Sequence, residues 1–116
     1  RRCRGVVEGI GAEAGDATGD GTGGSGQNIT AEFNGEKHSR GAVSMARAQN
    51  PNSADSQFFI VLDDSLFLDG QYTVWGRVTE GMDLVDAIKK GSKSDNGSVS
   101  DPDIIVSLKV AADVAE

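Results

Sequence analysis

The stretch Ser56-Gln57-Phe58-Phe59-Ile60-Val61-Leu62 decides the fold class. Its β-branched and aromatic residues lie between turn-forming residues, a composition typical of a β-strand. Side chains alternate between the two faces of a strand. One face therefore carries Phe58, Ile60 and Leu62, and the other carries Gln57, Phe59 and Val61. The second face presents a polar amide beside an aromatic ring.

Further strands are predicted on both sides of this stretch. They cover the short pair Val6-Val7 and residues 42–48, 72–78 and 104–110. Residues 82–91 have apolar side chains at helical spacing, lysines near the end and a terminal glycine, which predicts a short helix. Residues 9–29 and 91–102 are predicted to be loops. Short strands with long loops and one helix favour a mostly antiparallel sheet or barrel.

Length and charge restrict the class of protein. The chain has 116 residues, 37% of them hydrophobic, which suits a single domain over residues 1–116. Its net charge of −7 disfavours a nucleic-acid partner. The sequence contains no apolar run long enough to cross a bilayer. Cys3 is the only cysteine, so we expect no disulfide within the chain and a cytoplasmic protein.

Common forms of catalysis have weak signals. The lone His38 is predicted to be a solvated loop residue, and Ser44 lacks the setting of a serine nucleophile. The glycines at positions 21, 23 and 26 have the spacing of a phosphate-binding loop but no flanking strand and helix. We therefore expect no metal site and no cofactor. The residues are compatible with a reaction that requires neither.

Rotation of an X-Pro peptide bond is such a reaction. Its barrier of about 20 kcal/mol arises from amide resonance, so a catalyst needs only to bind the twisted state more tightly than the planar ones. This requires an apolar pocket for the proline ring, polar groups for the flanking carbonyl and a cationic donor near the prolyl nitrogen. Gln57 and Phe59 could supply the first two.

The order of several motifs carries a specific resemblance. The motifs are His38-Ser39-Arg40-Gly41-Ala42-Val43-Ser44-Met45-Ala46-Arg47-Ala48, Ser56-Gln57-Phe58-Phe59-Ile60, Phe67-Leu68-Asp69-Gly70-Gln71-Tyr72-Thr73-Val74-Trp75-Gly76-Arg77-Val78 and Glu80-Gly81-Met82-Asp83-Leu84-Val85-Asp86. In this order they resemble the cyclophilin family of peptidyl-prolyl cis-trans isomerases, especially its short bacterial members. The resemblance covers roughly residues 15 to 110. It implies an eight-stranded antiparallel β-barrel with capping helices and an active groove on its outer face.

The resemblance also implies the residues of the site. Gln57, Phe59 and Tyr72 match catalytic positions. The substrate-binding positions are matched by Ala46, Arg47, Ala48, Phe67, Leu68, Gly21, Thr22 and Gly23. The implied partners are X-Pro-containing polypeptides, and the implied role is to assist protein folding. The acidic surface favours a monomer. Phe67 occupies a position often held by Trp, which weakens the expectation that cyclosporin-like ligands bind.

The amino-terminal part departs from the family pattern. Gly5 stands where the family has its catalytic arginine, and the family's opening strands and first helix are absent, so the domain is expected to be partial. Arg4 could replace that arginine only if the strand register slipped by one residue. Three hypotheses stay open: an active isomerase, a non-catalytic module that binds proline peptides, and an inactive fragment.

Overall fold

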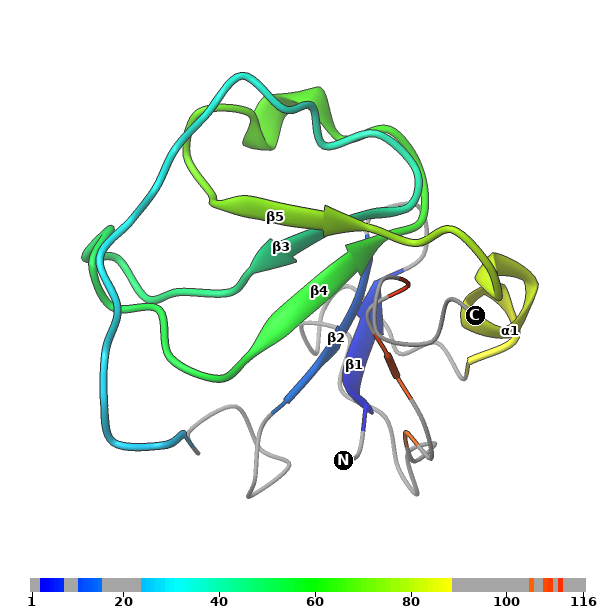
Figure 1. Cartoon of the computed structure of the whole chain (residues 1–116), viewed down its shortest axis with the longest axis horizontal. Coiled ribbons are helices and arrows are strands. Elements are labelled where there is room, and N and C mark those ends of the chain that lie inside the picture. The colour runs from blue at the N-terminus through cyan, green and yellow to red at the C-terminus, as the bar shows by residue number, and fades with distance from the viewer. Residues whose placement is uncertain are drawn as a thin grey trace.

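The structure is a computed structural model that describes residues 3–7, 11–15, 24–88, 105, 108–109 and 111. Within these residues the chain forms five β-strands, one 3-10 turn and one short α-helix (Figure 1). The elements are β1 (Cys3–Val7), β2 (Gly11–Ala14), β3 (Ala42–Met45), β4 (Phe58–Val61), η1 (Leu66–Leu68), β5 (Val74–Arg77) and α1 (Met82–Asp86).

The five strands form one antiparallel sheet in the order β1-β2-β4-β3-β5, with β4 in the centre. Pairing aligns four residues in a row across the sheet: Gly5 lies opposite Glu13, Glu13 opposite Phe59, and Phe59 opposite Ser44. Directly paired residues present their side-chain positions to the same face. The mostly β, antiparallel class predicted from the sequence is confirmed.

The two faces of β4 have the alternation that its sequence predicts. On one face Phe59 packs against the buried residues Ala42, Val61 and Val74. On the other face Phe58 meets the ring of Trp75 edge-on, with centroids 6.3 Å apart. The described hydrophobic core is small and contains no aromatic residue: Ala12, Ala14, Ala42, Val43, Ala54, Ile60, Val61, Leu62 and Val74.

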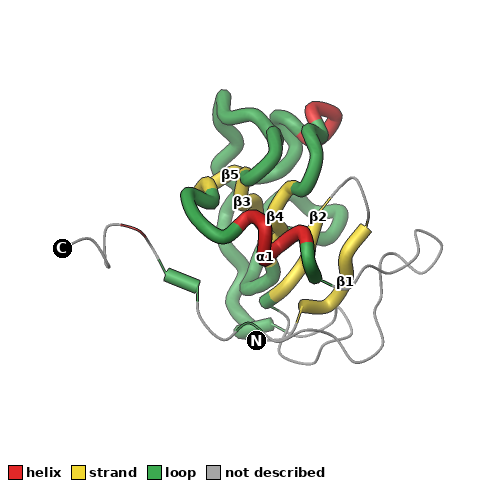
Figure 2. Tube along the Cα trace, turned by 90° about the vertical axis from the view of Figure 1, so that its right-hand side faces the viewer, coloured by secondary structure: helices red, strands yellow, loops and turns green. Residues whose placement is uncertain are grey.

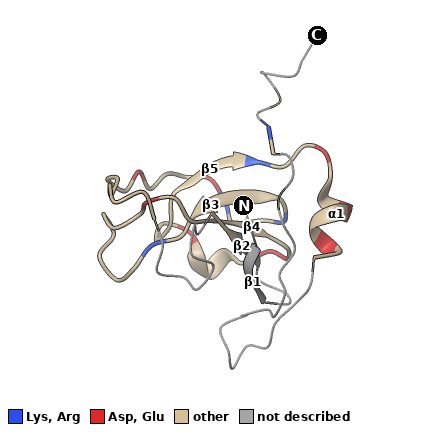
Figure 3. Ribbon diagram, turned by 90° about the horizontal axis from the view of Figure 1, so that it is seen from below, with Lys and Arg blue, Asp and Glu red and all other residues tan. Residues whose placement is uncertain are grey.

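Helix α1 covers the end of the sheet (Figures 1 and 2). Met82 and Val85 of the helix, and Ile88 two residues beyond its end, pack against Ala12 and Leu62. The guanidinium of Arg40 fixes the helix electrostatically, because Nη1 and Nη2 donate to the two carboxylate oxygens of Asp86 at 2.8 and 2.6 Å. The Asp86 bond raises the pKa of Arg40 above its ordinary value. Figure 3 marks the acidic residues of α1 in red along the ribbon.

Several boundaries differ from the prediction. Strand β2 lies inside the region predicted to be a loop, and the three strands β3, β4 and β5 are shorter than predicted. The helix ends at Asp86, short of the predicted end at residue 91. The predicted strand at 104–110 lies largely outside the described residues. Strand β2 consists of glycine, alanine and glutamate, which rarely form strands, and its pairing on both sides with β1 and β4 provides the stability that its composition lacks.

Candidate active site

Two half-buried aromatic side chains form the centre of the site. Phe59 projects from β4, and Tyr72 lies just before β5. Their rings meet edge-on with centroids 5.8 Å apart and an interplanar angle of 86°. We call this pair of rings the aromatic corner. Because both rings remain partly exposed, it offers an apolar surface to a small ring from a ligand.

His38 lies beneath this corner and is fully buried. Its imidazole stacks on Phe59 at a centroid distance of 6.0 Å and an angle of 16°, and it meets Tyr72 edge-on at 6.3 Å. The expectation of a solvated loop histidine is therefore wrong. A polar ring can be buried here because both of its nitrogens have hydrogen-bonding partners.

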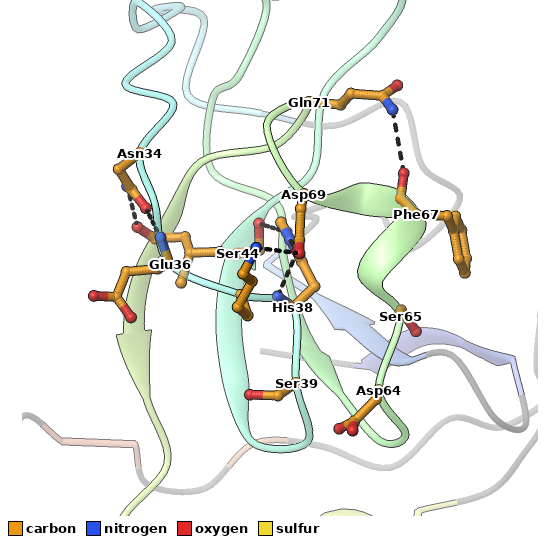
Figure 4. Close-up of polar contacts among 12 residues, drawn as sticks. Asn34, Glu36, His38, Ser39, Ser44, Asp64, Ser65, Phe67, Asp69 and Gln71 are labelled. Atoms are coloured by element: carbon orange, nitrogen blue, oxygen red, sulfur yellow. Dashed lines mark hydrogen bonds and ion pairs between the residues drawn. The ribbon is translucent and has the colours of Figure 1, made fainter.

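The partners of His38 come from separate parts of the chain (Figure 4). Nδ1 lies 2.9 Å from Asp69 Oδ1, and Nε2 lies 2.9 Å from Ser44 Oγ. The backbone N–H of His38 also donates to Asp69 Oδ1 at 2.7 Å. This backbone bond, more than the ring or the nearby Lys37, holds the pKa of the Asp69 carboxyl below its ordinary value.

The order Asp69, His38, Ser44 resembles a serine-nucleophile triad, yet the geometry opposes that chemistry. Ser44 has no exposed surface, and its hydroxyl donates to the carbonyl oxygen of Thr73 at 3.0 Å. A nucleophile must reach its substrate, and this hydroxyl is enclosed. We infer that the three side chains have a structural role: they hold the His38 ring in place against the buried side of the aromatic corner. Nothing in the local sequence of His38 indicates this role, because its partners lie up to 31 residues away.

The segment after β3 lies along one side of the corner. The backbone N–H of Ala46 donates to the carbonyl of Gln57 at 3.0 Å, which brings these two predicted site residues together. The guanidinium carbon of Arg47 lies 4.7 Å from the centre of the Tyr72 ring. Ala46, Arg47 and Gln57 are half-buried, and Ala48 is exposed. The structure thus places Gln57, Ala46 and Arg47 around Phe59 and Tyr72.

The turn η1 carries Phe67 and Leu68. Leu68 is half-buried, whereas Phe67 is 65% exposed and points away from His38 (Figure 4). His38 holds this turn as well, because its carbonyl accepts the N–H of Ser65 at 2.7 Å. The amide of Gln71 donates to the Phe67 carbonyl at 3.2 Å. A single buried histidine therefore links the turn to β3 and to the aromatic corner.

The predicted site residues Gly21, Thr22 and Gly23 lie outside the described residues. Asp55 holds the segment at Ser25 and Gly26: its carboxylate accepts the N–H and hydroxyl of Ser25 at 2.8 and 2.6 Å and the N–H of Gly26 at 3.1 Å. The Ser25 hydroxyl is the largest cause of the lowered pKa of Asp55. Gly24 permits this approach, since a Cβ there would lie 2.7 Å from Asp55 Oδ2.

Gly5 lies in the same cross-strand row as Phe59, two strands away. The position matched to the family's arginine therefore faces the site side of the sheet without a side chain. The pairing of β1 with β2 shifts between Cys3 and Gly5, so Arg4 is the extra residue of a bulge. The side chains of Arg4 and Glu13 lie outside the described part of the chain.

Among the described residues, no group of three or more His, Cys, Asp and Glu side chains could hold a metal ion. The described helices also include none that is long and apolar enough to span a membrane.

The chain is similar to known proteins in sequence and in fold. A family model described as cyclophilin type peptidyl-prolyl cis-trans isomerase/CLD matches residues 3–110. The chain is 58% identical over 99 residues to a probable peptidyl-prolyl cis-trans isomerase of Brucella abortus, a match that covers 84% of this chain and 50% of the relative. It is 43% identical over 90 residues to a peptidyl-prolyl cis-trans isomerase of Helicobacter pylori, covering 74% of this chain and 55% of that protein.

Two solved structures are also similar. Cyclophilin AquaCyp293 from Hirschia baltica superimposes with a TM-score of 0.79 at 27% identity, covering 98% of this chain and 60% of that one. A Cryptosporidium parvum cyclophilin type isomerase, crystallised in the presence of the dipeptide Ala-Pro, gives 0.71 at 27% identity, covering 87% and 68%. The chain spans about half the length of the curated relatives it matches.

Proposed function

The chain belongs to the cyclophilin-type peptidyl-prolyl cis-trans isomerase family, and from this membership we propose that it catalyses the isomerisation of X-Pro bonds in polypeptides. The observation that carries the proposal is the half-buried corner of Phe59 and Tyr72, backed by the buried ring of His38. A rigid apolar corner of this kind suits a pyrrolidine ring. The Ala-Pro dipeptide that was present in the crystals of the Cryptosporidium relative contains such a ring.

The reaction requires no bond to be made or broken. Amide resonance imposes a barrier of about 20 kcal/mol, and a site lowers it by binding the twisted amide more tightly than either planar form. Phe59, Tyr72 and Leu68 would hold the proline ring while the amide of Gln57 bonds the flanking carbonyl. Because the held ring and carbonyl would both lie on the proline side of the amide C–N bond, the residue before proline can rotate about that bond.

Gly5 limits the expected rate. As the amide twists, the prolyl nitrogen gains a lone pair, and a cationic donor would stabilise it. Gly5 provides no donor at the position in the Phe59 row. This observation favours one alternative, a module that binds proline peptides without accelerating their isomerisation.

Exchange spectroscopy by NMR on a blocked Ala-Pro peptide tests the proposal, because uncatalysed exchange takes about 10–100 s and gives no exchange peaks. We expect exchange peaks with catalytic amounts of the wild-type chain, their loss in Phe59→Ala and their retention in Trp75→Phe, which changes an aromatic side chain on the opposite face of the sheet. Gly5→Arg should increase the exchange rate. Binding of the peptide without exchange in wild type or Gly5→Arg would favour the non-catalytic module, and absence of both would contradict the proposal.

Finer features of the function belong to the same proposal. We propose unfolded or flexible polypeptides as substrates, a role in protein folding, a monomeric state and a cytoplasmic location, the last supported by the single cysteine. Phe67 at the position often held by Trp supports weak binding of cyclosporin-like ligands.

A further inference from the structure

Arg47 is fixed at the edge of the aromatic corner by neutral groups. Its Nε donates to the Gln71 carbonyl at 2.9 Å, and its Nη1 donates to the carbonyls of Ala48 and Gln49 at 2.9 and 3.2 Å. Its guanidinium also lies over the ring of Tyr72 at 4.7 Å. These contacts hold the side chain in one place without neutralising its charge.

Arg47 forms no ion pair with a carboxylate among the residues that the structure describes. Arg40 differs from Arg47 in this respect, because it forms a two-bond pair with Asp86. Asp55 is engaged by Ser25 and Gly26, and Asp69 is engaged by His38 and Lys37. The chain has a net charge of −7, and Arg47 is an ordered cation without a described acidic partner beside the proposed proline pocket.

We infer that Arg47 selects substrates with an acidic side chain next to the proline. The inference rests on the proposed function, and it names the substrate class: X-Pro segments in which a carboxylate or phosphate lies beside the proline. The bonds to Gln71, Ala48 and Gln49 use the N–H of Nε and the N–H groups of Nη1, so Nη2 is the nitrogen that would donate a charge-assisted hydrogen bond to such a group. Its fixed position reduces the entropy that would be lost on binding.

Two blocked peptides test the inference, acetyl-Ala-Glu-Pro-Phe-amide and the same peptide with Gln in place of Glu. The two differ only in charge. NMR titration of the Phe59 and Tyr72 signals gives a dissociation constant for each peptide, and exchange spectroscopy gives kcat/KM. Because Arg47 is half-buried and preordered, we expect the Glu peptide to bind about two- to fivefold more tightly at low salt. Raising the ionic strength to about 0.5 M, where the screening length is about 4 Å, should reduce the preference.

Variants assign the preference to this residue. Arg47→Gln should reduce the ratio of the two dissociation constants to about one, and Arg47→Lys should retain part of it, because Lys keeps the charge without the planar donor set. Arg77→Gln is the matched control: it removes an arginine whose described bonds are to Ser39, Arg40 and Lys37, outside the aromatic corner. It should leave the ratio as in wild type.

The outcomes separate the inference from the proposed function. Equal affinity for the two wild-type titrations would overturn the role of Arg47 and leave the isomerase proposal standing. A Glu preference that persists in Arg47→Gln would also overturn it, because another group would then be responsible. If neither peptide binds to the wild-type chain, both proposals fail. Should Arg47→Gln not fold, the wild-type ratio, its salt dependence and Arg47→Lys still decide the matter.

Discussion

His38 connects three segments that are far apart in the sequence. It bonds to Asp69 next to η1 and to Ser44 on β3, and it stacks on Phe59 of β4. Its burial therefore supports the position of the aromatic corner as well as the stability of the sheet. An alanine in its place would leave a cavity beneath Phe59 and remove both ring hydrogen bonds.

We predict that His38→Ala lowers the free energy of unfolding by about 2–4 kcal/mol, because it combines a cavity with lost buried hydrogen bonds. Urea denaturation followed by far-UV circular dichroism measures the change. Lys37→Ala is the control: it alters the neighbouring residue and its 3.7 Å contact with the same Asp69, but its side chain is largely exposed. Its effect should stay within about 0.5 kcal/mol. Equal losses in the two variants would contradict the role given to the buried ring.

Asp69 makes stability depend on pH. Its folded pKa lies below its ordinary value, chiefly because the backbone N–H of His38 donates to the carboxylate. In the unfolded chain the pKa of this aspartate is about 3.9, so as the pH falls the unfolded chain binds the proton before the folded chain does. The contribution is present above about pH 4 and is lost as the pH drops through the folded pKa.

The corresponding prediction concerns Asp69→Asn. Urea midpoints measured from pH 7 down to about pH 2 should fall less steeply below pH 4 in this variant than in wild type. Asp83→Asn removes an exposed carboxylate on α1 that accepts no described side-chain hydrogen bond, and its profile should follow the wild type. Parallel profiles for Asp69→Asn and wild type would show that this carboxylate does not contribute.

The junction between β2 and β4 depends on a glycine. Gly15 follows β2 with a φ of 93°, and a Cβ there would clash with the Ser56 carbonyl oxygen. Both the left-handed backbone and the close approach exclude other residues. We predict that Gly15→Ala destabilises the chain by about 2–4 kcal/mol in urea denaturation.

Gly35→Ala provides the comparison for Gly15→Ala. A Cβ at Gly35 would meet nothing within 4 Å, and its φ is not positive. Its effect should therefore stay within about 0.5 kcal/mol in either direction. A tolerated Gly15→Ala would mean that β2 and β4 separate more readily than their pairing indicates.

The sequence predicts an element well when the contacts that stabilise it lie close together in the chain. The alternation in β4 depends on neighbouring residues, and the structure confirms it in Phe58 and Phe59. Strand β2 is stabilised by pairing with two other strands, and its own residues do not indicate a strand. The burial of His38 depends on Ser44 and Asp69, and only the assembled fold brings these together. Local patterns therefore predict strands, whereas the support of the site requires tertiary contacts.

The whole molecule carries an acidic excess, with 18 acidic against 11 basic residues. Mutual repulsion among like charges destabilises the folded state, and salt screens it. Salt also weakens favourable pairs, but both Arg40 and Asp86 are exposed, and the pair of Lys37 with the half-buried Asp69 involves an exposed lysine at 3.7 Å. Exposed pairs contribute little, so relief of the repulsion should dominate.

We therefore predict that the melting temperature rises with NaCl between about 0.02 and 0.3 M, by about 2–4 °C. Circular dichroism at constant pH measures it. Removing exposed acidic charge with Glu80→Gln and Asp83→Asn should reduce the salt response, because less repulsion remains to be screened. A melting temperature that falls with salt would contradict this prediction. It would show that local pairs such as Arg40 with Asp86 stabilise the folded state by more than the overall repulsion destabilises it.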